Sequence, residues 1–233
     1  MKTIKKCIIG KYEYYVVGVS VMGKNKIENQ DSFLIADRKS SLVITVADGL
    51  GSAPFSKEGA NAICPLCAEM LNSEITKETI IKLKEDWKKK IKTDFDKYDT
   101  TIKYIAFSDS EIKYGGVGDG WICIYENDEV LSTEIDHTFS NQTDSILSID
   151  LLNKFLNKQM VASGDFVSLI ATDGFSEDID KANLKAFMKD IQNSMVTDID
   201  AFANEIDETL NNWPLETNCD DKTVVFVLRR GIA

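Results

Sequence analysis

The sequence predicts an α+β fold in which largely antiparallel sheets are covered by helices. Strand-like segments come first, followed by two helical segments, a long run of strands, two more helical segments and a final strand. Because strands and helices do not alternate strictly, a doubly wound parallel sheet does not fit this order. The 233 residues contain no visible linker, repeat or low-complexity tract. We therefore expect residues 1–233 to form a single domain with a full core.

The first fifty residues favour strands. Aromatic and β-branched residues dominate residues 12–21, and further apolar runs at 32–36 and 41–47 flank a charged turn. After Gly51 the pattern changes to small and apolar residues over 56–71, which indicates a helix.

A stripe of apolar residues then recurs at spacings of three and four, which predicts one amphipathic helix reaching Tyr98. The stripe consists of Ile80, Leu83, Trp87, Ile91, Phe95 and Tyr98. The lysine run 88–90 is expected on the outer face of this helix. Cys64 and Cys67, in the preceding segment, have redox spacing but no second Cys or His pair, so core packing is predicted for them.

Strand patterns dominate the middle of the chain. They cover residues 101–107, 111–117, 121–125 and 129–133. Residues 136–157 are weakly patterned, with a short helix expected at their end, whereas 166–172 is the clearest buried strand.

Apolar spacing predicts two further helices near the C-terminus. Leu184, Phe187, Met188 and Ile191 mark the first, and Ile199, Phe202, Ile206, Leu210 and Trp213 mark the second. Asp198 and Asp200 favour the start of the second helix, because carboxylates stabilise helix N-termini. Pro214 ends this helix, and residues 223–228 form the final strand.

Charge and composition argue against several classes of partner. A net charge of −11 opposes binding to a nucleic-acid backbone or an anionic membrane. The N-terminal apolar run is too short for a signal peptide, and no stretch approaches the ~20 apolar residues of a membrane span. Five scattered cysteines suit reduced thiols better than a disulfide framework. We expect a cytoplasmic protein without nucleic-acid or membrane partners.

Two apolar strands end in the same way, in Asp48-Gly49 and in Asp173-Gly174. A carboxylate where a buried strand emerges is costly unless a positive group meets it. Asp31 opens the strand before the first of these sites, and Asp220 precedes the final strand together with Asp221. A single Asp-Gly is most often only a turn. For this pair, the pattern alone leaves both a turn and a shared metal site open.

If these carboxylates share a metal, the chemistry of their ligand atoms indicates which metal ion it is. Carboxylate and carbonyl oxygens favour Mg²⁺ or Mn²⁺, and one histidine, His137, nearly excludes a conventional zinc site. Two such ions about 3.5–4 Å apart would share a carboxylate and lower the pKa of a water that attacks phosphorus. His137 itself is expected to be a solvated surface group, with a proton donor to substrate as the alternative.

Five short motifs stand in order along the chain. They are Gly18 and Ser20 with 29–31; 46–52 with Ser56, Gly59 and Ala60; Thr101 with 117–120; 171–177; and 220–225. In this order they resemble the motifs of the metal-dependent protein phosphatase 2C family (PPM), in the form of a divergent bacterial branch. The resemblance spans residues 14–229.

The resemblance implies both a fold and an activity. The fold is a four-layer αββα sandwich, in which two antiparallel sheets are flanked by helical hairpins. The activity is that of a Mn²⁺- or Mg²⁺-dependent serine/threonine protein phosphatase, which hydrolyses phosphomonoesters with a water activated at a two-metal centre. The implied partners are phosphoserine and phosphothreonine proteins and a cognate serine/threonine kinase system. The enzyme is expected to act in signalling, as a monomer.

The resemblance also implies residue roles at the metals. Asp48 resembles the carboxylate that bridges the two metals, with Gly49 giving its carbonyl oxygen to one of them. Asp173 and Asp220 resemble ligands of the other metal, with Asp221 ranked below Asp220. Asp31 resembles the acid that holds water molecules at the centre.

A third metal and a phosphate-binding residue complete these expectations. Asp119, with Asp173 and Glu177, matches the place where bacterial members bind a third ion. Lys26 stands where many members carry a phosphate-binding arginine, and a lysine attracts phosphate only as a point charge.

Further departures keep two other functions open. Leu50 replaces a histidine found in animal members, and Gly120-Trp121 replaces Ser-Arg. One alternative is a catalytically weak module that binds a phosphoprotein or a regulatory partner, and another is a hydrolase of small phosphoesters. The retained acids argue against the silent module, because buried carboxylates are costly to keep without use.

Overall fold

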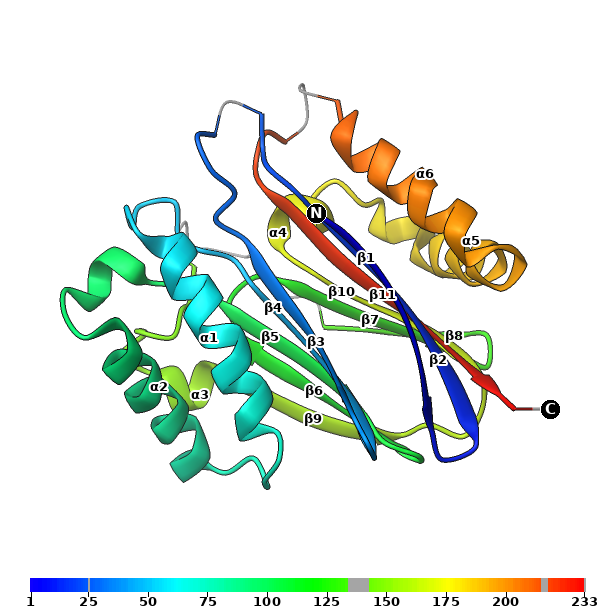
Figure 1. Cartoon of the computed structure of the whole chain (residues 1–233), viewed down its shortest axis with the longest axis horizontal. Helices are drawn as coiled ribbons and strands as arrows, with labels where there is room; N and C mark the ends of the chain where they lie inside the picture. The colour runs from blue at the N-terminus through cyan, green and yellow to red at the C-terminus, as the bar shows by residue number, and fades with distance from the viewer. Residues whose placement is uncertain (25, 134–142, 215–217, 233) are drawn as a thin grey trace.

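Two antiparallel sheets lie face to face with a pair of helices on each outer side (Figure 1). The structure is a computed structural model that describes residues 1–24, 26–133, 143–214 and 218–232. Its layers are the predicted αββα sandwich. The sequence expectation for His137 lies outside the described residues.

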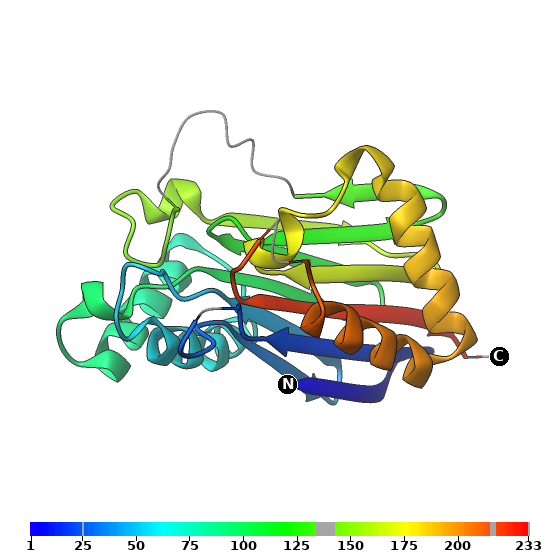
Figure 2. The ribbon, with the colours of Figure 1, turned by 90° about the horizontal axis from the view of Figure 1, so that it is seen from above.

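The first sheet has six strands in the order β1-β2-β11-β10-β7-β8. Figure 2 shows them side by side, from the blue N-terminal strand to the green β8. Their bounds are β1 Lys2–Ile9, β2 Tyr12–Val21, β7 Trp121–Glu126, β8 Glu129–Ser132, β10 Phe166–Ala171 and β11 Lys222–Gly231. The last strand, β11, inserts between β2 and β10, with Val225 opposite both Gly18 and Ile170.

The second sheet has five strands in the order β3-β4-β5-β6-β9. Their bounds are β3 Ser32–Arg38, β4 Ser41–Ala47, β5 Ile102–Phe107, β6 Glu111–Val117 and β9 Leu156–Val161. The sequence did not predict β1 or β9, and both are edge strands. Edge strands carry polar and charged residues, so the apolar pattern that indicates a strand is weak in KTIKKCII and LNKQMV.

The strand β10 is buried on both faces. Phe166 and Ile170 pack between the two sheets, whereas Val167, Leu169 and Ala171 pack under the helices of the first sheet. Such a strand reads as a continuous apolar run rather than an alternation. This explains why residues 166–172 gave the clearest strand signal in the sequence.

The helices α1 (Ser56–Met70) and α2 (Lys77–Ile91) cover the second sheet. Trp87 is fully buried there, and its indole N–H donates a 3.1 Å hydrogen bond to the Gly59 carbonyl. Cys64 and Cys67 are buried in the same layer, which confirms their prediction as core residues.

The prediction of a single helix through Tyr98 was wrong. The helix α2 ends at Ile91, because Lys92 and Asp94 adopt positive φ values of 79° and 49°. Phe95 and Tyr98 lie in a separate 3-10 helix, η1 (Phe95–Tyr98). Both still pack against the cluster beneath α1 and α2, so the apolar spacing continues although the helix does not.

The helices α5 (Leu184–Thr197) and α6 (Ile199–Asn211) cover the first sheet, as predicted. The Asp198 carboxylate caps α6 by accepting hydrogen bonds of 3.0 Å from the N–H groups of Asp200 and Ala201. Three short helices complete the chain: α3 Leu151–Lys154, α4 Asp173–Ser176 and η2 Lys181–Asn183. Within the described ranges, no helix has the length and apolar character needed to cross a membrane.

Candidate metal centre

Three carboxylates from both sheets converge at one end of the sandwich. Asp48 follows β4, Asp173 follows β10, and Asp119 lies in the turn between β6 and β7. Each offers one oxygen atom, and these atoms lie within 4.8 Å of one another. We call Asp48, Asp119 and Asp173 the acidic triad. The structure therefore brings together the two Asp-Gly strand ends that stand 125 residues apart in the sequence.

The backbone of Asp48 is fixed on both sides. Its N–H donates to the Thr101 hydroxyl at 2.9 Å, and its carbonyl accepts from the Thr101 N–H and the Thr100 hydroxyl, both at 2.8 Å. Gly49 forms a β-bridge with Thr100, and a Cβ atom at Gly49 would lie 2.7 Å from the Ser56 side chain. The chain thus needs glycine here, and the Asp48 carboxylate is aimed by a rigid support.

Asp173 opens the short helix α4 on the other sheet. One of its carboxylate oxygens accepts a 2.7 Å hydrogen bond from the N–H of Gly174. A Cβ atom at Gly174 would lie 2.0 Å from the Asp221 carbonyl oxygen. Glycine therefore allows the start of β11 to approach, which brings Asp220 to the same edge.

Asp119 has one satisfied and one unsatisfied carboxylate oxygen. Its Oδ2 accepts a 2.6 Å hydrogen bond from the Thr143 hydroxyl. Its Oδ1 is buried and has no hydrogen-bond partner among the described residues. A buried carboxylate oxygen without a donor is costly, so this atom points to a cation as its missing partner.

Asp31 lies buried behind the triad, with 8% of its surface exposed. Its Oδ2 accepts a 2.9 Å hydrogen bond from the Thr172 hydroxyl, and its N–H donates to the Asn29 side chain at 2.9 Å. No separate role was predicted for Thr172 from the sequence. Its place directly before Asp173 was the available signal, since a strand-end hydroxyl next to one site acid can also reach another.

Burial and the charges of neighbouring aspartates dominate the electrostatics of these acids. Burial raises the pKa of Asp31 and of Asp173 to about 7, and the charges of neighbouring aspartates add to the effect. Burial also raises the pKa of Asp48 well above its usual range, followed by the charges of Asp31, Asp173 and Asp220. A divalent cation among these oxygens would reverse the shifts. The donor set is all oxygen, so it fits Mg²⁺ or Mn²⁺.

Asp220 faces the same cleft but is not within the triad. Its carboxylate forms an ion pair with Lys26, whose Nζ also lies 3.4 Å from Asp221 Oδ2. Burial lowers the pKa of Lys26, yet the hydrogen bond to Asp220 and the surrounding aspartate charges outweigh it and raise that pKa. The resemblance implied that Lys26 faces a phosphate, and nothing in the sequence indicated this ion pair.

Asp221 is a structural anchor. It is buried, and its two oxygens accept hydrogen bonds of 2.8 and 2.9 Å from the N–H groups of Gly23 and Gln30. These bonds tie the loop before β3 to the start of β11, which supports ranking Asp221 below Asp220 as a ligand.

Glu177 stays apart from the triad. It is exposed at the end of α4, and Asn218 donates a 3.5 Å hydrogen bond to its Oε2. Its charge adds to the raised pKa of Asp173, so it acts on the centre only at a distance. Of the residues expected at a third ion, the structure brings Asp119 and Asp173 together and leaves Glu177 outside.

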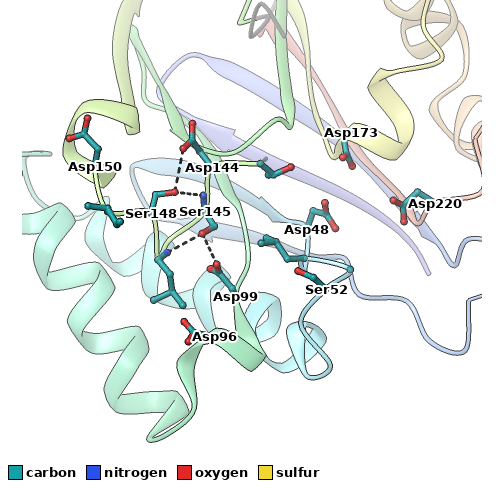
Figure 3. A pocket seen from close by; sticks show the side chains of 15 residues that line it. Asp48, Ser52, Asp96, Asp99, Asp144, Ser145, Ser148, Asp150, Asp173 and Asp220 are labelled. Carbon is teal, nitrogen blue, oxygen red and sulfur yellow. Dashed lines mark hydrogen bonds between the residues drawn. The ribbon is translucent and has the colours of Figure 1, made fainter. Parts of the chain in front are cut away.

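A cleft of about 740 Å³ opens beside the centre (Figure 3). Asp48, Asp173 and Asp220 form one wall. The opposite wall carries further acids that the sequence analysis did not single out: Asp96, Asp99, Asp144 and Asp150. Asp99 is held by the Ser145 hydroxyl, which donates to it at 2.7 Å. A phosphate would be repelled from such a cleft unless cations neutralise it.

The comparisons with known proteins agree with this geometry. Residues 21–213 match the family model described as Protein phosphatase 2C. A search of curated proteins found no match.

Solved structures share the fold. RsbX in complex with magnesium has a TM-score of 0.70 at 16% identity, covering 98% of this chain and 100% of that one. The catalytic domain of the serine/threonine phosphatase PstP, solved with two manganese ions, has a TM-score of 0.65 at 14% identity, covering 94% and 99%. A SpoIIE structure from Bacillus subtilis has a TM-score of 0.62 at 16% identity, covering 100% and 65%. At these identities the likeness shows the fold alone.

Proposed function

Because the chain belongs to the protein phosphatase 2C family, we propose that it is a Mn²⁺- or Mg²⁺-dependent serine/threonine protein phosphatase. The observation that carries this proposal is the convergence of Asp48, Asp119 and Asp173 within 4.8 Å, with one buried carboxylate oxygen left without a donor. A binding module has no use for such a cluster, because like charges at this distance oppose folding unless cations join them.

Different acids of the centre would hold the cations from different sides. Asp48 and the Gly49 carbonyl would hold cations at the end of β4, and Asp173 and Asp220 would hold them from the side of β10 and β11. When bound, the cations lower the pKa of a water molecule and offset the negative charge of the phosphoryl oxygens. The hydrogen bonds that the Asp48 backbone makes with Thr100 and Thr101 hold it in place, so its carboxylate needs little reorganisation.

Asp31 and Lys26 act on water and phosphate. Asp31, held by Thr172, orients water on the inner side of the centre. Lys26 attracts the substrate phosphate as a point charge. A cation at Asp220 competes with the Lys26 ammonium for the same carboxylate, so occupation of the centre makes Lys26 available to the substrate.

Phosphoserine and phosphothreonine proteins are the substrates we propose, with the enzyme acting as a monomer opposite a serine/threonine kinase. The open cleft supports a protein substrate, since about 740 Å³ with acidic walls accommodates a chain segment beside the phosphate. Two proteins of the same fold support the choice of metals: PstP, a serine/threonine phosphatase solved with two manganese ions, and RsbX, solved with magnesium.

Hydrolysis of p-nitrophenyl phosphate tests the activity most directly. We expect turnover with Mn²⁺, none with a chelator, and none in an Asp173→Ala variant. The matched control is Asp190→Ala, which removes an exposed acid on α5 and should keep full activity. Absence of metal-dependent turnover in the wild type would favour the silent binding module, and turnover surviving Asp173→Ala would show that the centre is misassigned.

Substrate class then needs a second comparison. We expect phosphoserine and phosphothreonine peptides to be hydrolysed with higher kcat/KM than nucleotides or sugar phosphates. The opposite ranking would favour the hydrolase of small phosphoesters.

A further inference from the structure

A lysine is buried inside the sandwich beneath the acidic triad. Lys103, on β5, has only 3% of its surface exposed. Ile102 and Tyr104 pack toward the helical layer, whereas Ile105 and Phe107 pack between the sheets. Side chains alternate along a strand, so Lys103 shares the inward face of Ile105. Lysine is almost never fully buried without a compensating group, so its position requires an explanation.

The neighbours of Lys103 place it directly under the metal centre. It stands opposite Val46 on β4 and Gly116 on β6. A Cβ atom at Gly120 would lie 3.1 Å from Cγ and 3.7 Å from Cε of Lys103, and 2.8 Å from the Ala171 carbonyl oxygen. Three of these neighbours are each close in sequence to a member of the triad. Val46 lies two residues before Asp48, Gly120 lies one residue after Asp119, and Ala171 lies two residues before Asp173. The lysine side chain therefore lies close to the ends of β4 and β10 and to the turn between β6 and β7, which carry the triad.

The charges around Lys103 fit this placement. Burial lowers its pKa to about 8, and the charges of Asp119 and Asp144 oppose that fall and favour the ammonium form. With so little exposure, Lys103 does not reach a substrate in the cleft. Its charge acts on the centre from inside the protein.

We propose that the Lys103 ammonium is a fixed internal cation of the metal centre, which offsets the charge of Asp119 and thereby weakens the binding of an additional divalent ion there. Lys103 is a positioning residue, since it acts through Asp119 and is not among the residues that line the cleft. The inference rests on the proposed function, because it concerns the same centre. Repulsion between a buried ammonium and a nearby divalent ion is substantial at the effective dielectric constant of ~20 in proteins.

Calorimetric titration of the intact protein with Mn²⁺ tests this role without relying on activity. We expect Lys103→Met to bind Mn²⁺ at least about tenfold more tightly at its weakest site, or to take up one more ion than the wild type. Lys103→Arg keeps the charge and should bind as the wild type does. The matched control is Lys113→Met, which removes a partly exposed lysine paired with Glu111 on the same sheet and should change nothing.

Two results would overturn the inference. One is a Lys103→Met variant whose affinity stays within about twofold of the wild type at the same stoichiometry, or falls below it. The other is a gain in affinity that persists when Asp119→Asn is added, because the effect should require the Asp119 charge. Should the methionine variant fail to fold, Lys103→Gln carries the same expectations. A wild type that binds no Mn²⁺ overturns the proposed function as well, whereas unchanged binding after Lys103→Met overturns this inference alone.

Discussion

Buried charges have opposite surroundings at the two ends of the space between the sheets. At the end where β10 begins, Arg229 is fully buried, and its guanidinium lies 4.1 Å and 4.5 Å from the ring centroids of Tyr12 and Phe166. Its Nε donates a 2.9 Å hydrogen bond to the Gly164 carbonyl, and Glu126 stands 3.7 Å away. At the end where β10 finishes, the acidic triad gathers like charges instead.

The difference separates a structural charge from a functional one. Around Arg229, aromatic faces, a carbonyl and a carboxylate all favour the cation. Around the triad, burial raises the pKa of Asp48 and of Asp173, and the charges of neighbouring aspartates raise both further, so the protein alone gains no stability from the arrangement. A fold that surrounds a buried charge with favourable partners at one end and gathers several like charges at the other has a use for the second end.

The substitution with the largest expected effect on activity is Asp48→Asn, at the acidic end. We expect p-nitrophenyl phosphate turnover to fall at least about 10³-fold, since the shared ligand proposed for Asp48 would support several kcal/mol of transition-state stabilisation. The metal-free variant should melt at a higher temperature than the metal-free wild type, because one of the repelling charges is gone. Turnover within about tenfold of the wild type would remove Asp48 from the centre.

At the other end, Arg229→Met should affect stability and leave the metal centre alone. Removing the buried guanidinium leaves Glu126 without its cation and the Gly164 carbonyl without its donor, and we expect a loss of about 3 kcal/mol in the free energy of unfolding. Denaturant titration measures this loss. Arg230→Met, at the exposed neighbouring position, is the control and should cost little. A change in Mn²⁺ affinity after Arg229→Met would show that the two ends are not independent.

The sequence anticipated the acidic end better than the rest of the molecule. Asp48 and Asp173 were predictable as site residues because each directly follows or closely follows a strongly apolar strand. In both cases an Asp-Gly pair shows where the apolar run stops. The edge strands β1 and β9 were not predictable, since strands with one paired neighbour tolerate lysines and amides. The apolar spacing that continues to Tyr98 gave a wrong prediction of the end of α2. Phe95 and Tyr98 lie outside that helix but still pack on the apolar cluster beneath α1 and α2.

The lysines of the site were the hardest to place. Lys26 lies in a loop, so its pairing with Asp220 depends on how β11 sits beside the start of β3. Lys103 lies in a strand buried on both faces, so no alternation in the sequence reveals that its side chain points inward. Both positions are set by contacts between segments distant in the sequence, which local patterns do not record.

The buried acids should also make the stability of the metal-free protein depend on pH. Asp31 and Asp173 have pKa values of about 7 in the folded protein, above the ordinary value of about 3.9 in an unfolded chain. The folded state therefore binds more protons than the unfolded state between these values, so stability falls as pH rises from about 4 to about 7. We expect the metal-free protein to melt at least about 4 °C lower at pH 7.5 than at pH 5.5.

Bound cations should flatten this pH dependence, because they favour the ionised carboxylates. Thermal melts at both pH values, with a chelator and with Mn²⁺, measure the difference. Asp173→Asn should reduce the slope of the metal-free protein, whereas Asp190→Asn on α5 should not. A metal-free protein that becomes more stable over this pH range would contradict the description of the acidic end.

The smallest expected effect concerns Lys26, which borders both the centre and the cleft. If it attracts the substrate phosphate, Lys26→Ala should raise KM for a phosphopeptide about three- to tenfold and leave kcat within about twofold, because a point charge contributes about 1 kcal/mol at a partly exposed site. Lys26→Arg should restore KM. The control is Lys24→Ala, which removes an exposed lysine bound to the Trp213 carbonyl.

A purely structural Lys26 would behave differently, because its only role would be to neutralise Asp220. Lys26→Ala would then tighten Mn²⁺ binding by removing a competitor for that carboxylate, and KM at saturating Mn²⁺ would not change. Measuring KM at saturating metal therefore separates the two roles, since competition for Asp220 vanishes there while attraction of the phosphate remains. An unchanged KM under that condition would place Lys26 with Arg229, among the charges that the fold keeps for its own stability.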